Sequence, residues 1–221
     1  MNGVDLVIFD CDGVLVDSEP IAARVGAAVL TDLGWPVTPE ELVDRFAGCT
    51  DEHWRAGVEE GLGRSLEDGW EVPYESWYEE AFDADLRAVP GVAAAIAALE
   101  VPSCVASNGS HAKVATNLRR VGLADAFDDR HRFSAQDVAT GKPAPDLFLH
   151  AARTLGAAPE RCVVVEDSPT GLAAARAAGM RCLAYAGGVI ATDRLAGPAT
   201  TVFDDMADLP RLVAALQGPG M

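Results

Sequence analysis

Three apolar runs of the sequence each end in polar residues whose side chains can take part in catalysis. In chain order these residues are Asp10 and Asp12, Ser107 and Asn108, and Glu166 and Asp167. A lysine, Lys142, stands between the second and third groups in a Gly-Lys-Pro turn. Ligands of open parallel sheets bind beyond the carboxyl ends of the strands, so we expect these groups to converge there on one site.

The predicted site contains four carboxylates, which belong to Asp10, Asp12, Glu166 and Asp167. Four carboxylates that lie close together cannot all stay ionised without a compensating positive charge. Ligand sets made only of oxygen atoms suit Mg²⁺. We therefore predict a magnesium cofactor, which would bind a phosphoryl oxygen and allow an anionic substrate to approach an anionic nucleophile.

The residue types indicate a role in phosphoryl transfer for each member of the site. Asp10 is the predicted nucleophile, because a carboxylate can form an acyl phosphate and divide one difficult displacement into two easier ones. Asp12 is the predicted acid and base, which protonates the leaving oxygen and later takes a proton from water. Ser107 and Asn108 can hydrogen-bond to phosphoryl oxygens, and Lys142 supplies a positive charge beside the transferring group.

Short apolar runs predict five strands that position these residues. The runs occupy residues 4–9, 103–106, 132–134, 162–165 and 181–185. From residue 90 onward helical stretches alternate with the runs, a pattern typical of βαβ units and of a parallel sheet covered on both faces. End signals predict three of the helices, over residues 110–122, 145–156 and 168–179. The pattern predicts an α/β fold.

A second segment interrupts this alternation, because it contains helical patterns without a strand. A capping box with a proline at the first helical position predicts a helix that begins after Thr38. Residues 51–60 and 74–87 predict two further helices. The same segment holds all four tryptophans of the chain.

A length of 221 residues allows one catalytic core and a modest additional module. We predict that residues 1–16 and 89–221 form the core. Residues 17–88 are predicted to form a helical insertion that folds over the end of the sheet. Its hinges are expected near residues 17–20 and 88–91.

Composition and charge exclude several classes of partner. The chain has 17 basic and 34 acidic side chains, and its net charge of −17 repels nucleic acid and anionic membranes. No apolar run approaches the roughly 20 residues of a membrane-spanning helix. The first residues lack the features of a secretory signal. We expect a cytoplasmic monomer whose partner is a small phosphorylated metabolite.

The five cysteines contain no C-x-x-C pair. Their odd number and their spacing fit neither a disulfide framework nor a structural zinc site. Cys104, Cys162 and Cys182 lie within apolar runs, so we predict that they are buried, reduced thiols.

Four segments, in this order, resemble the signature motifs of the haloacid dehalogenase-like superfamily. They are FDCDGVLVDSE (residues 9–19), SNG (107–109), GKPAPD (141–146) and VEDSPTG (165–171). The resemblance implies a Rossmann-like core with a mobile helical cap inserted after the first strand.

The resemblance also implies roles for individual residues. It implies that Asp10 is the nucleophile and Asp12 the acid and base, while Ser107 and Lys142 hold the phosphate. The implied ligands of Mg²⁺ are Asp10, the backbone carbonyl of Asp12, Asp167 and Glu166, the last either directly or through water.

The superfamily contains dehalogenases, mutases and phosphatases, and residues of this sequence help to choose among them. Dehalogenases lack an acidic residue two positions after the nucleophile, so Asp12 argues against dehalogenation. Mutases of the β-phosphoglucomutase type carry an arginine just after the cap glycine and a histidine early in the cap. The matching residues 48–52 contain no arginine, and Ile-Ala-Ala follows Pro20. We favour a phosphatase similar to the bacterial sugar-phosphate and 6-phosphogluconate phosphatases, with the mutase as the alternative.

Two further classes of protein are weighed against this interpretation. A signalling receiver domain also gathers acidic residues, a hydroxyl and a lysine, but its lysine comes last in the chain, whereas Lys142 precedes Glu166 and Asp167. A catalytically silent binding protein would lack one of the reacting groups, and this chain retains all of them.

Substrate specificity is expected to reside in the helical insertion, because a lid that closes over the site contacts the leaving group. On position alone, Arg45, Thr50, His53 and Trp54 are the candidates.

Overall fold

A computed structural model of the chain describes residues 3–217, in which six parallel strands form one sheet. The strands are β1 (Leu6–Phe9), β2 (Ser103–Ser107), β3 (Arg132–Ser134), β4 (Cys162–Glu166), β5 (Arg181–Tyr185) and β6 (Thr200–Phe203). Their order across the sheet is β3-β2-β1-β4-β5-β6. This Rossmann-like order confirms the predicted α/β fold and places β1 in the centre of the sheet.

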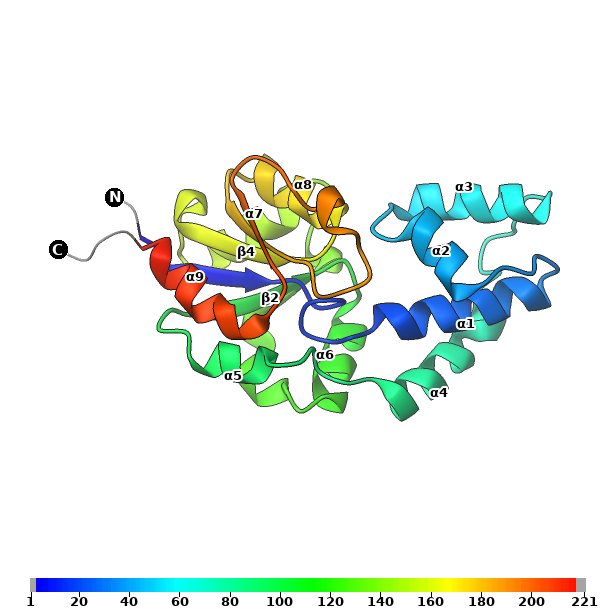
Figure 1. Cartoon of the computed structure of the whole chain (residues 1–221), viewed down its shortest axis with the longest axis horizontal. Coiled ribbons are helices and arrows are strands. Elements are labelled where there is room, and N and C mark those ends of the chain that lie inside the picture. Colours follow the sequence, from blue (N-terminus) through cyan, green and yellow to red (C-terminus); the bar gives the residue numbers. More distant parts are fainter. Residues whose placement is uncertain (1–2, 218–221) are drawn as a thin grey trace.

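Helices cover both faces of the sheet (Figure 1), as the alternating pattern predicts. One face packs against α5 (Val92–Ala97), α6 (His111–Arg120) and α9 (Leu209–Ala215). The other face packs against α7 (Asp146–Thr154) and α8 (Pro169–Ala177). Every residue of β1 is buried, because side chains on both of its faces enter a core.

Short 3₁₀ helices connect several of these elements. Within residues 3–217 they are η1 (Val72–Tyr74), η2 (Ala124–Ala126), η3 (Asp129–His131), η4 (Ala135–Asp137), η5 (Pro159–Arg161), η6 (Thr192–Arg194) and η7 (Met206–Asp208).

The helix ends follow the capping chemistry of the sequence. The hydroxyl of Ser110 accepts a hydrogen bond from the backbone of α6, and that of Ser168 accepts one from the backbone of α8. Glycines with positive φ follow α6, α7 and α8, where the chain turns out of each helix. The strand β6 was not predicted, because it lies at the sheet edge and only one of its four residues is buried.

Four helices form the insertion between β1 and β2. They are α1 (Glu19–Asp32), α2 (Pro39–Phe46), α3 (Asp51–Leu62) and α4 (Glu75–Asp85). We call this group of helices the cap. It has its own small core, which includes Leu30, Leu42 and Val58, with Trp35, Trp54 and Trp70 packed around it. Figure 1 shows the cap beyond the carboxyl end of β1.

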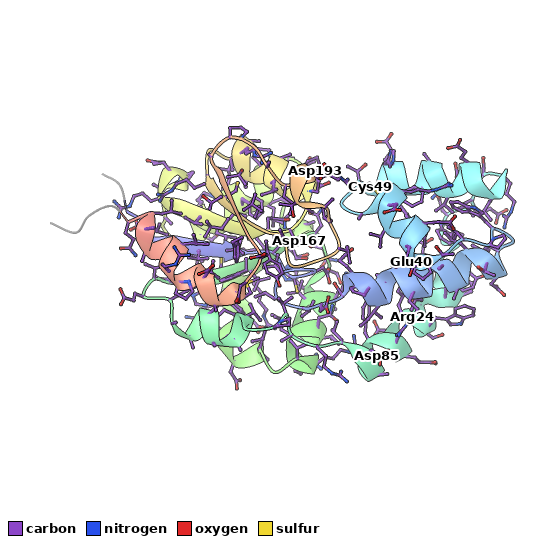
Figure 2. The ribbon with its side chains drawn as sticks, in the orientation of Figure 1. Arg24, Glu40, Cys49, Asp85, Asp167 and Asp193 are labelled. Atoms are coloured by element: carbon purple, nitrogen blue, oxygen red, sulfur yellow. The ribbon has the colours of Figure 1, made fainter. Side chains whose placement is uncertain are left out.

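The two connections between core and cap run side by side. The backbone N–H of Asp17 donates to the carbonyl of Arg87 at 3.0 Å, and that of Val89 donates to Leu15 at 3.1 Å. Farther out, Arg24 of α1 pairs with Asp85 of α4 (Figure 2). These contacts support our proposal that residues 17–88 form a unit distinct from the core.

A loop of the cap also touches the core at a second place. The hydroxyl of Thr170 in α8 donates to the carbonyl of Gly48 at 2.5 Å, and Arg194 donates to the carbonyl of Ala47 at 2.9 Å. Gly48 has a φ of +68°, and a Cβ atom there would lie 2.6 Å from Cδ of Pro169. The loop therefore rests on the core where only glycine fits.

None of the helices between residues 3 and 217 combines the length and the apolar character needed to cross a membrane. In the same part of the chain no disulfide joins the cysteines. Cys104, Cys162 and Cys182 are buried, as predicted, and Cys11 is buried as well.

The Gly48 contact gives a first prediction. We expect Gly48→Ala to destabilise the protein by about 1–3 kcal/mol, because the methyl group meets Pro169 and the backbone is left-handed. Gly63→Ala is the matched control, since Gly63 has a φ of +65° and nothing within 4 Å of its Cβ position. Thermal unfolding measures both variants. Equal losses of melting temperature would show that the contact with the core contributes nothing.

Candidate active site

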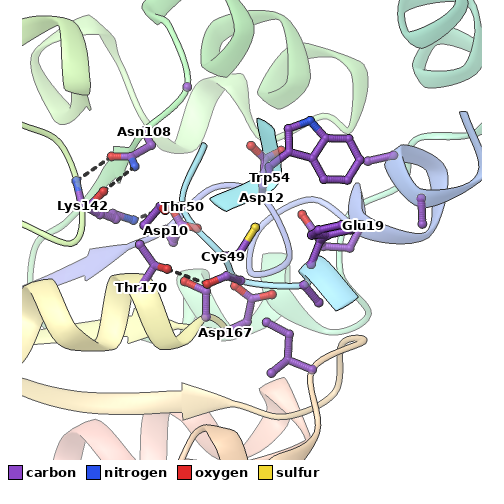
Figure 3. Close-up of a pocket in the computed structure, with 18 of the residues that line it drawn as sticks. Asp10, Asp12, Glu19, Cys49, Thr50, Trp54, Asn108, Lys142, Asp167 and Thr170 are labelled. Carbon is purple, nitrogen blue, oxygen red and sulfur yellow. Dashed lines mark hydrogen bonds and ion pairs between the residues drawn. The ribbon is translucent and has the colours of Figure 1, made fainter. Parts of the chain in front are cut away.

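A cavity of about 500 Å³ lies between the carboxyl ends of the strands and the cap. All seven residues predicted for the site line it, namely Asp10, Asp12, Ser107, Asn108, Lys142, Glu166 and Asp167. Figure 3 shows the labelled members of this set with their cap neighbours. In Figure 2, Asp167 marks the core side and Cys49 the cap side of the same region.

A buried lysine lies at the centre of the site. The ammonium group of Lys142 is 2.6 Å from Oδ1 of Asp10 and 2.8 Å from Oε1 of Glu166. The side chains of Lys142 and Glu166 are 4% and 0% exposed, so water screens this cluster poorly. The ammonium group also lies 4.8 Å from the centre of the Phe148 ring. One cation thus joins the ends of β1 and β4.

The pKa values of Asp10 and Lys142 are both raised, but for different reasons. Burial raises the pKa of Asp10 to about 7, although Lys142 opposes the shift, and Glu166 adds to it. Burial alone would lower the pKa of Lys142, but Asp10 and Glu166 outweigh it and raise that pKa. The lysine therefore stays charged, while Asp10 is held near the balance between its two forms.

The turn that carries Lys142 is held by Asn108. The Asn108 side-chain amide donates to the carbonyl of Lys142 at 3.0 Å, and its oxygen accepts from the N–H of Lys142 at 2.8 Å. Gly141 leaves room for this contact, since a Cβ atom there would lie 2.6 Å from Oδ1 of Asn108. The Asn108 side chain, predicted to bind phosphate, is thus engaged by backbone 34 residues away.

Ser107 ends β2 and is buried beside this turn. Its hydroxyl oxygen accepts the N–H of Gly109 at 3.1 Å. Within residues 3–217 its hydroxyl proton has no acceptor, so this hydrogen is available to a ligand in the cavity.

Both carboxylate oxygens of Asp12 are held. Oδ1 accepts the hydroxyl of Ser18 at 2.9 Å, and Oδ2 pairs with the ammonium group of Lys113 at 2.7 Å. Ser18 occupies the N-cap position of α1, yet its side chain does not cap that helix. The sequence reasoning missed Ser18 and Lys113 as site residues. A signal was present for the second, because Lys113 and Lys142 are the only lysines of the chain.

Glu166 is fixed by its neighbours on both sides. Oε1 accepts from Lys142, while Oε2 accepts from the N–H and the hydroxyl of Ser168 at 2.9 and 2.8 Å. Gly171 makes room for the carboxylate, because a Cβ atom at this glycine would lie 1.6 Å from Oε1.

Asp167 differs from Glu166 in having no such partners. It is 4% exposed, and none of the described residues donates a hydrogen bond to its side chain. A Cβ atom at Gly13 would lie 1.9 Å from Oδ2 of Asp167, so glycine makes room for this carboxylate as well. Burial raises the pKa of Asp167, and so do Glu166 and Asp10.

The acidic residues fit a metal ion. Oxygen atoms of Asp10, Glu166 and Asp167 lie within 4.8 Å of one another. A buried carboxylate without a partner costs free energy unless a positive charge compensates it, and Asp167 is such a group. A set of carboxylate oxygens suits a hard divalent cation. The side chain of Asp12 lies outside this cluster and faces Lys113.

The cap lines the side of the cavity opposite the strand ends, and only some of its predicted residues take part. Of the four specificity candidates, Thr50 and Trp54 line the cavity, and Arg45 and His53 do not. Arg45 lies over the ring of Trp35 at 5.6 Å, and His53 packs edge-on against Phe46. The cap residues that sequence reasoning missed include Glu19 and Tyr78, which also line the cavity.

The raised pKa values predict how stability depends on pH. Aspartates titrate near pH 4 in an unfolded chain. Between about pH 4 and pH 7 the unfolded chain loses protons that folded Asp10 and Asp167 keep, so the metal-free protein loses stability as pH rises. We expect its melting temperature to fall between about pH 4 and pH 7 from this cause, and Mg²⁺ to raise it mainly at the higher pH.

Asp167→Asn isolates this effect from the rest of the protein. At about pH 8 without metal, we expect this variant to melt above the wild type, by roughly 2–4 °C for each kcal/mol of repulsion removed. Mg²⁺ should then stabilise it far less than the wild type. Glu40→Gln removes an exposed carboxylate outside the cavity and is the control. The same response to Mg²⁺ in wild type and Asp167→Asn would contradict the assignment.

Comparisons with known proteins show the family of this chain. Residues 4–179 match the family model of the haloacid dehalogenase-like hydrolases. The chain is 31% identical over 214 residues to the 6-phosphogluconate phosphatase of Escherichia coli (strain K12), with 96% of each chain covered. It is also 31% identical to hexitol phosphatase A of the same organism, over 80% of this chain and 81% of that protein.

A solved structure extends the comparison to three dimensions. A conserved haloacid dehalogenase-like protein from Agrobacterium tumefaciens str. C58 is 41% identical and superposes with a TM-score of 0.86, over 97% of this chain and 99% of the other. The match to the family model covers most of the chain, including the strand ends that carry the site. This chain therefore belongs to the haloacid dehalogenase-like hydrolases and resembles their sugar-phosphate phosphatases.

Proposed function

We propose that this chain is a magnesium-dependent phosphatase that hydrolyses a sugar phosphate or sugar-acid phosphate through an aspartyl phosphate on Asp10. The observation that carries the proposal is the contact of Asp10 with the buried ammonium group of Lys142 at 2.6 Å. Lys142 holds Oδ1, and no described side chain donates to the other oxygen of Asp10, which is therefore available as the nucleophile. The same cavity holds Asp12 and Asp167.

The first step is a displacement at phosphorus. An oxygen of Asp10 attacks the phosphorus atom, and the bond between phosphorus and the ester oxygen of the leaving group breaks. Asp12 enters this step protonated and gives its proton to that ester oxygen, which departs as an alcohol. Ser18 and Lys113 hold the Asp12 carboxylate in one orientation for this transfer.

The second step returns the enzyme to its starting state. Asp12 accepts a proton from a water molecule as this water attacks the phosphorus atom of the aspartyl phosphate. The bond between phosphorus and Asp10 breaks, so inorganic phosphate leaves and the Asp10 carboxylate is restored. Asp12 therefore acts first as an acid and then as a base.

The phosphoryl oxygens need donors on the core side of the cavity. We assign this role to Lys142, to the hydroxyl of Ser107 and to the backbone N–H of Asn108. The side-chain amide of Asn108 contributes indirectly, because it holds the Lys142 turn in place.

We propose Asp10, Asp167 and the backbone carbonyl of Asp12 as ligands of Mg²⁺. Glu166 already accepts hydrogen bonds on both oxygens, so we assign its contact with the ion to an intervening water. When bound, the ion would neutralise the carboxylates and bind a phosphoryl oxygen.

The net charge and the cysteines bear on the partners and the location of the enzyme. We propose that it acts as a monomer on small metabolites, because a net charge of −17 opposes binding to nucleic acid. The absence of disulfides between the described cysteines fits a reducing compartment and supports a cytoplasmic location.

Variants of the two aspartates test the mechanism. We expect Asp10→Asn to lower kcat by about 10³-fold or more with the fold intact, because an amide is a poor nucleophile. Phosphate release is measured over sugar phosphates, sugar-acid phosphates, phosphoglycolate and nucleotides, with and without Mg²⁺, and circular dichroism checks the fold. Glu40→Gln removes an exposed carboxylate outside the cavity, is the control and should retain activity. Metal-stimulated turnover that survives in Asp10→Asn would contradict the nucleophile assignment.

The mutase alternative has a separate test. Such an enzyme must hold a second phosphate in the cap, yet the cavity walls described here contain only two cationic side chains, Lys113 and Lys142, both from the core. We expect β-glucose 1-phosphate with its bisphosphate activator to yield no glucose 6-phosphate. A coupled assay for glucose 6-phosphate measures this, and efficient isomerisation would favour the mutase.

A further inference from the structure

The cavity contains a carboxylate to which the phosphoryl chemistry gives no role. Glu19 is the first residue of α1, lines the cavity and is partly buried. Within residues 3–217 no group donates a hydrogen bond to its side chain or forms an ion pair with it. Asp167 shares this property but belongs to the acidic cluster that fits a metal, and Glu19 lies outside that cluster.

Glu19 lies on the leaving-group side of the site. Its charged neighbours include Asp12 and Lys113. Figure 3 shows it near Trp54 and across the cavity from Lys142 and Asn108, the groups assigned to the phosphoryl oxygens. In the proposed reaction Asp12 transfers its proton to the ester oxygen. A carboxylate beside Asp12 on the cap side therefore faces the carbon atoms next to that oxygen.

An acidic residue in the first turn of a helix is common, because it interacts favourably with the helix dipole. That explanation accounts for the position of Glu19 in α1 but not for its place in a cavity beside the like charge of Asp12. Like charges and burial both disfavour an ionised carboxylate there. The charge of Lys113 offsets part of this cost, and hydrogen-bond donors from a ligand would offset more of it.

The chemistry of Glu19 and its charged neighbour Lys113 indicates which ligand group would bind there. An ionised carboxylate only accepts hydrogen bonds, so Glu19 pairs with hydroxyl groups and repels another carboxylate. The ammonium group of Lys113 has three N–H donors, of which Asp12 takes one. The remaining donors match hydroxyl oxygens. An acceptor and a donor side by side suit neighbouring hydroxyl groups of a sugar or polyol.

We propose that Glu19 is a specificity-determining residue, which accepts hydrogen bonds from hydroxyl groups next to the phosphoester carbon and repels a carboxylate at that position. The inference rests on the proposed phosphatase function and narrows its substrates to phosphorylated sugars and polyols. Sugar acids whose carboxylate lies far from the ester remain within this class. Phosphorylated acids with the carboxylate beside the ester, such as phosphoglycolate, lie outside it.

Three small monoesters of similar size distinguish hydrogen bonding between Glu19 and hydroxyl groups from repulsion between Glu19 and a carboxylate. Glycerol 1-phosphate offers hydroxyl groups, propyl phosphate offers none, and phosphoglycolate offers a carboxylate. The kcat/KM of each is measured by phosphate release with Mg²⁺ for the wild type, Glu19→Ala and Glu19→Gln. Glu40→Gln removes an exposed carboxylate of the cap that does not line the cavity and is the matched control.

The test compares the ratio of kcat/KM between two substrates in each variant with the same ratio in the wild type. In Glu19→Ala we expect the preference for glycerol 1-phosphate over propyl phosphate to fall about tenfold, because the acceptor of the hydroxyl groups is lost. In Glu19→Gln we expect phosphoglycolate to gain about tenfold relative to glycerol 1-phosphate, because the repelling charge is lost. Glu40→Gln should keep the wild-type ratios.

A purely structural role of Glu19 would lower all three values by one factor and leave the ratios unchanged, and that result would overturn the inference. Wild-type ratios in both Glu19 variants would overturn it as well. A folded wild type that released phosphate neither from these three esters nor from any sugar phosphate or sugar-acid phosphate of the panel above would contradict the phosphatase function itself, and with it this inference.

Discussion

The ion pairs of Lys142 with Asp10 and Glu166 are the contacts on which the arrangement of the site depends. They bring one ammonium group and two carboxylates from three separate segments into a region that water reaches poorly. Removing one member of such a cluster leaves a buried charge without compensation, which typically costs about 3–5 kcal/mol. The neighbouring contacts serve this cluster. Asn108 fixes the backbone of Lys142, and Ser168 fixes the far side of Glu166.

The second constraint is the negative charge that the protein leaves uncompensated. Lys142 and Lys113 are the only ammonium groups in the described cavity, and they face Asp10, Asp12 and Glu166. No described side chain compensates the carboxylate of Asp167. A protein selected for stability alone would avoid a buried, unpaired carboxylate. Its presence is explained if a divalent cation belongs there, and the burial that destabilises the metal-free site then strengthens the binding of that cation.

The sequence predicted the parts of the fold that depend on local pattern. Apolar runs predicted the strands β1 to β5, and the residue types after β1, β2 and β4 predicted which side chains meet at the sheet edge. The strand β6 was not predicted, because an exposed edge strand has no continuous apolar run. The engagement of Asn108 by the Lys142 backbone also could not be predicted, since it joins residues 34 positions apart through a turn geometry that composition does not specify. Glu19 was not predicted as a site residue, because the helix dipole is a sufficient explanation for an acidic residue in the first turn of a helix.

In the proposed reaction, the core and the cap have different roles. Every group assigned to the phosphoryl oxygens or to the metal comes from the core, where paired strands fix its position. The described cap residues of the cavity instead combine an unpaired carboxylate, Glu19, with the rings of Trp54 and Tyr78. Because the cap is joined to the core through two adjacent segments and touches it again near Gly48, its helices can change without moving the strand ends. In this proposal, changes in the cap can therefore alter substrate preference while the chemistry at Asp10 is retained.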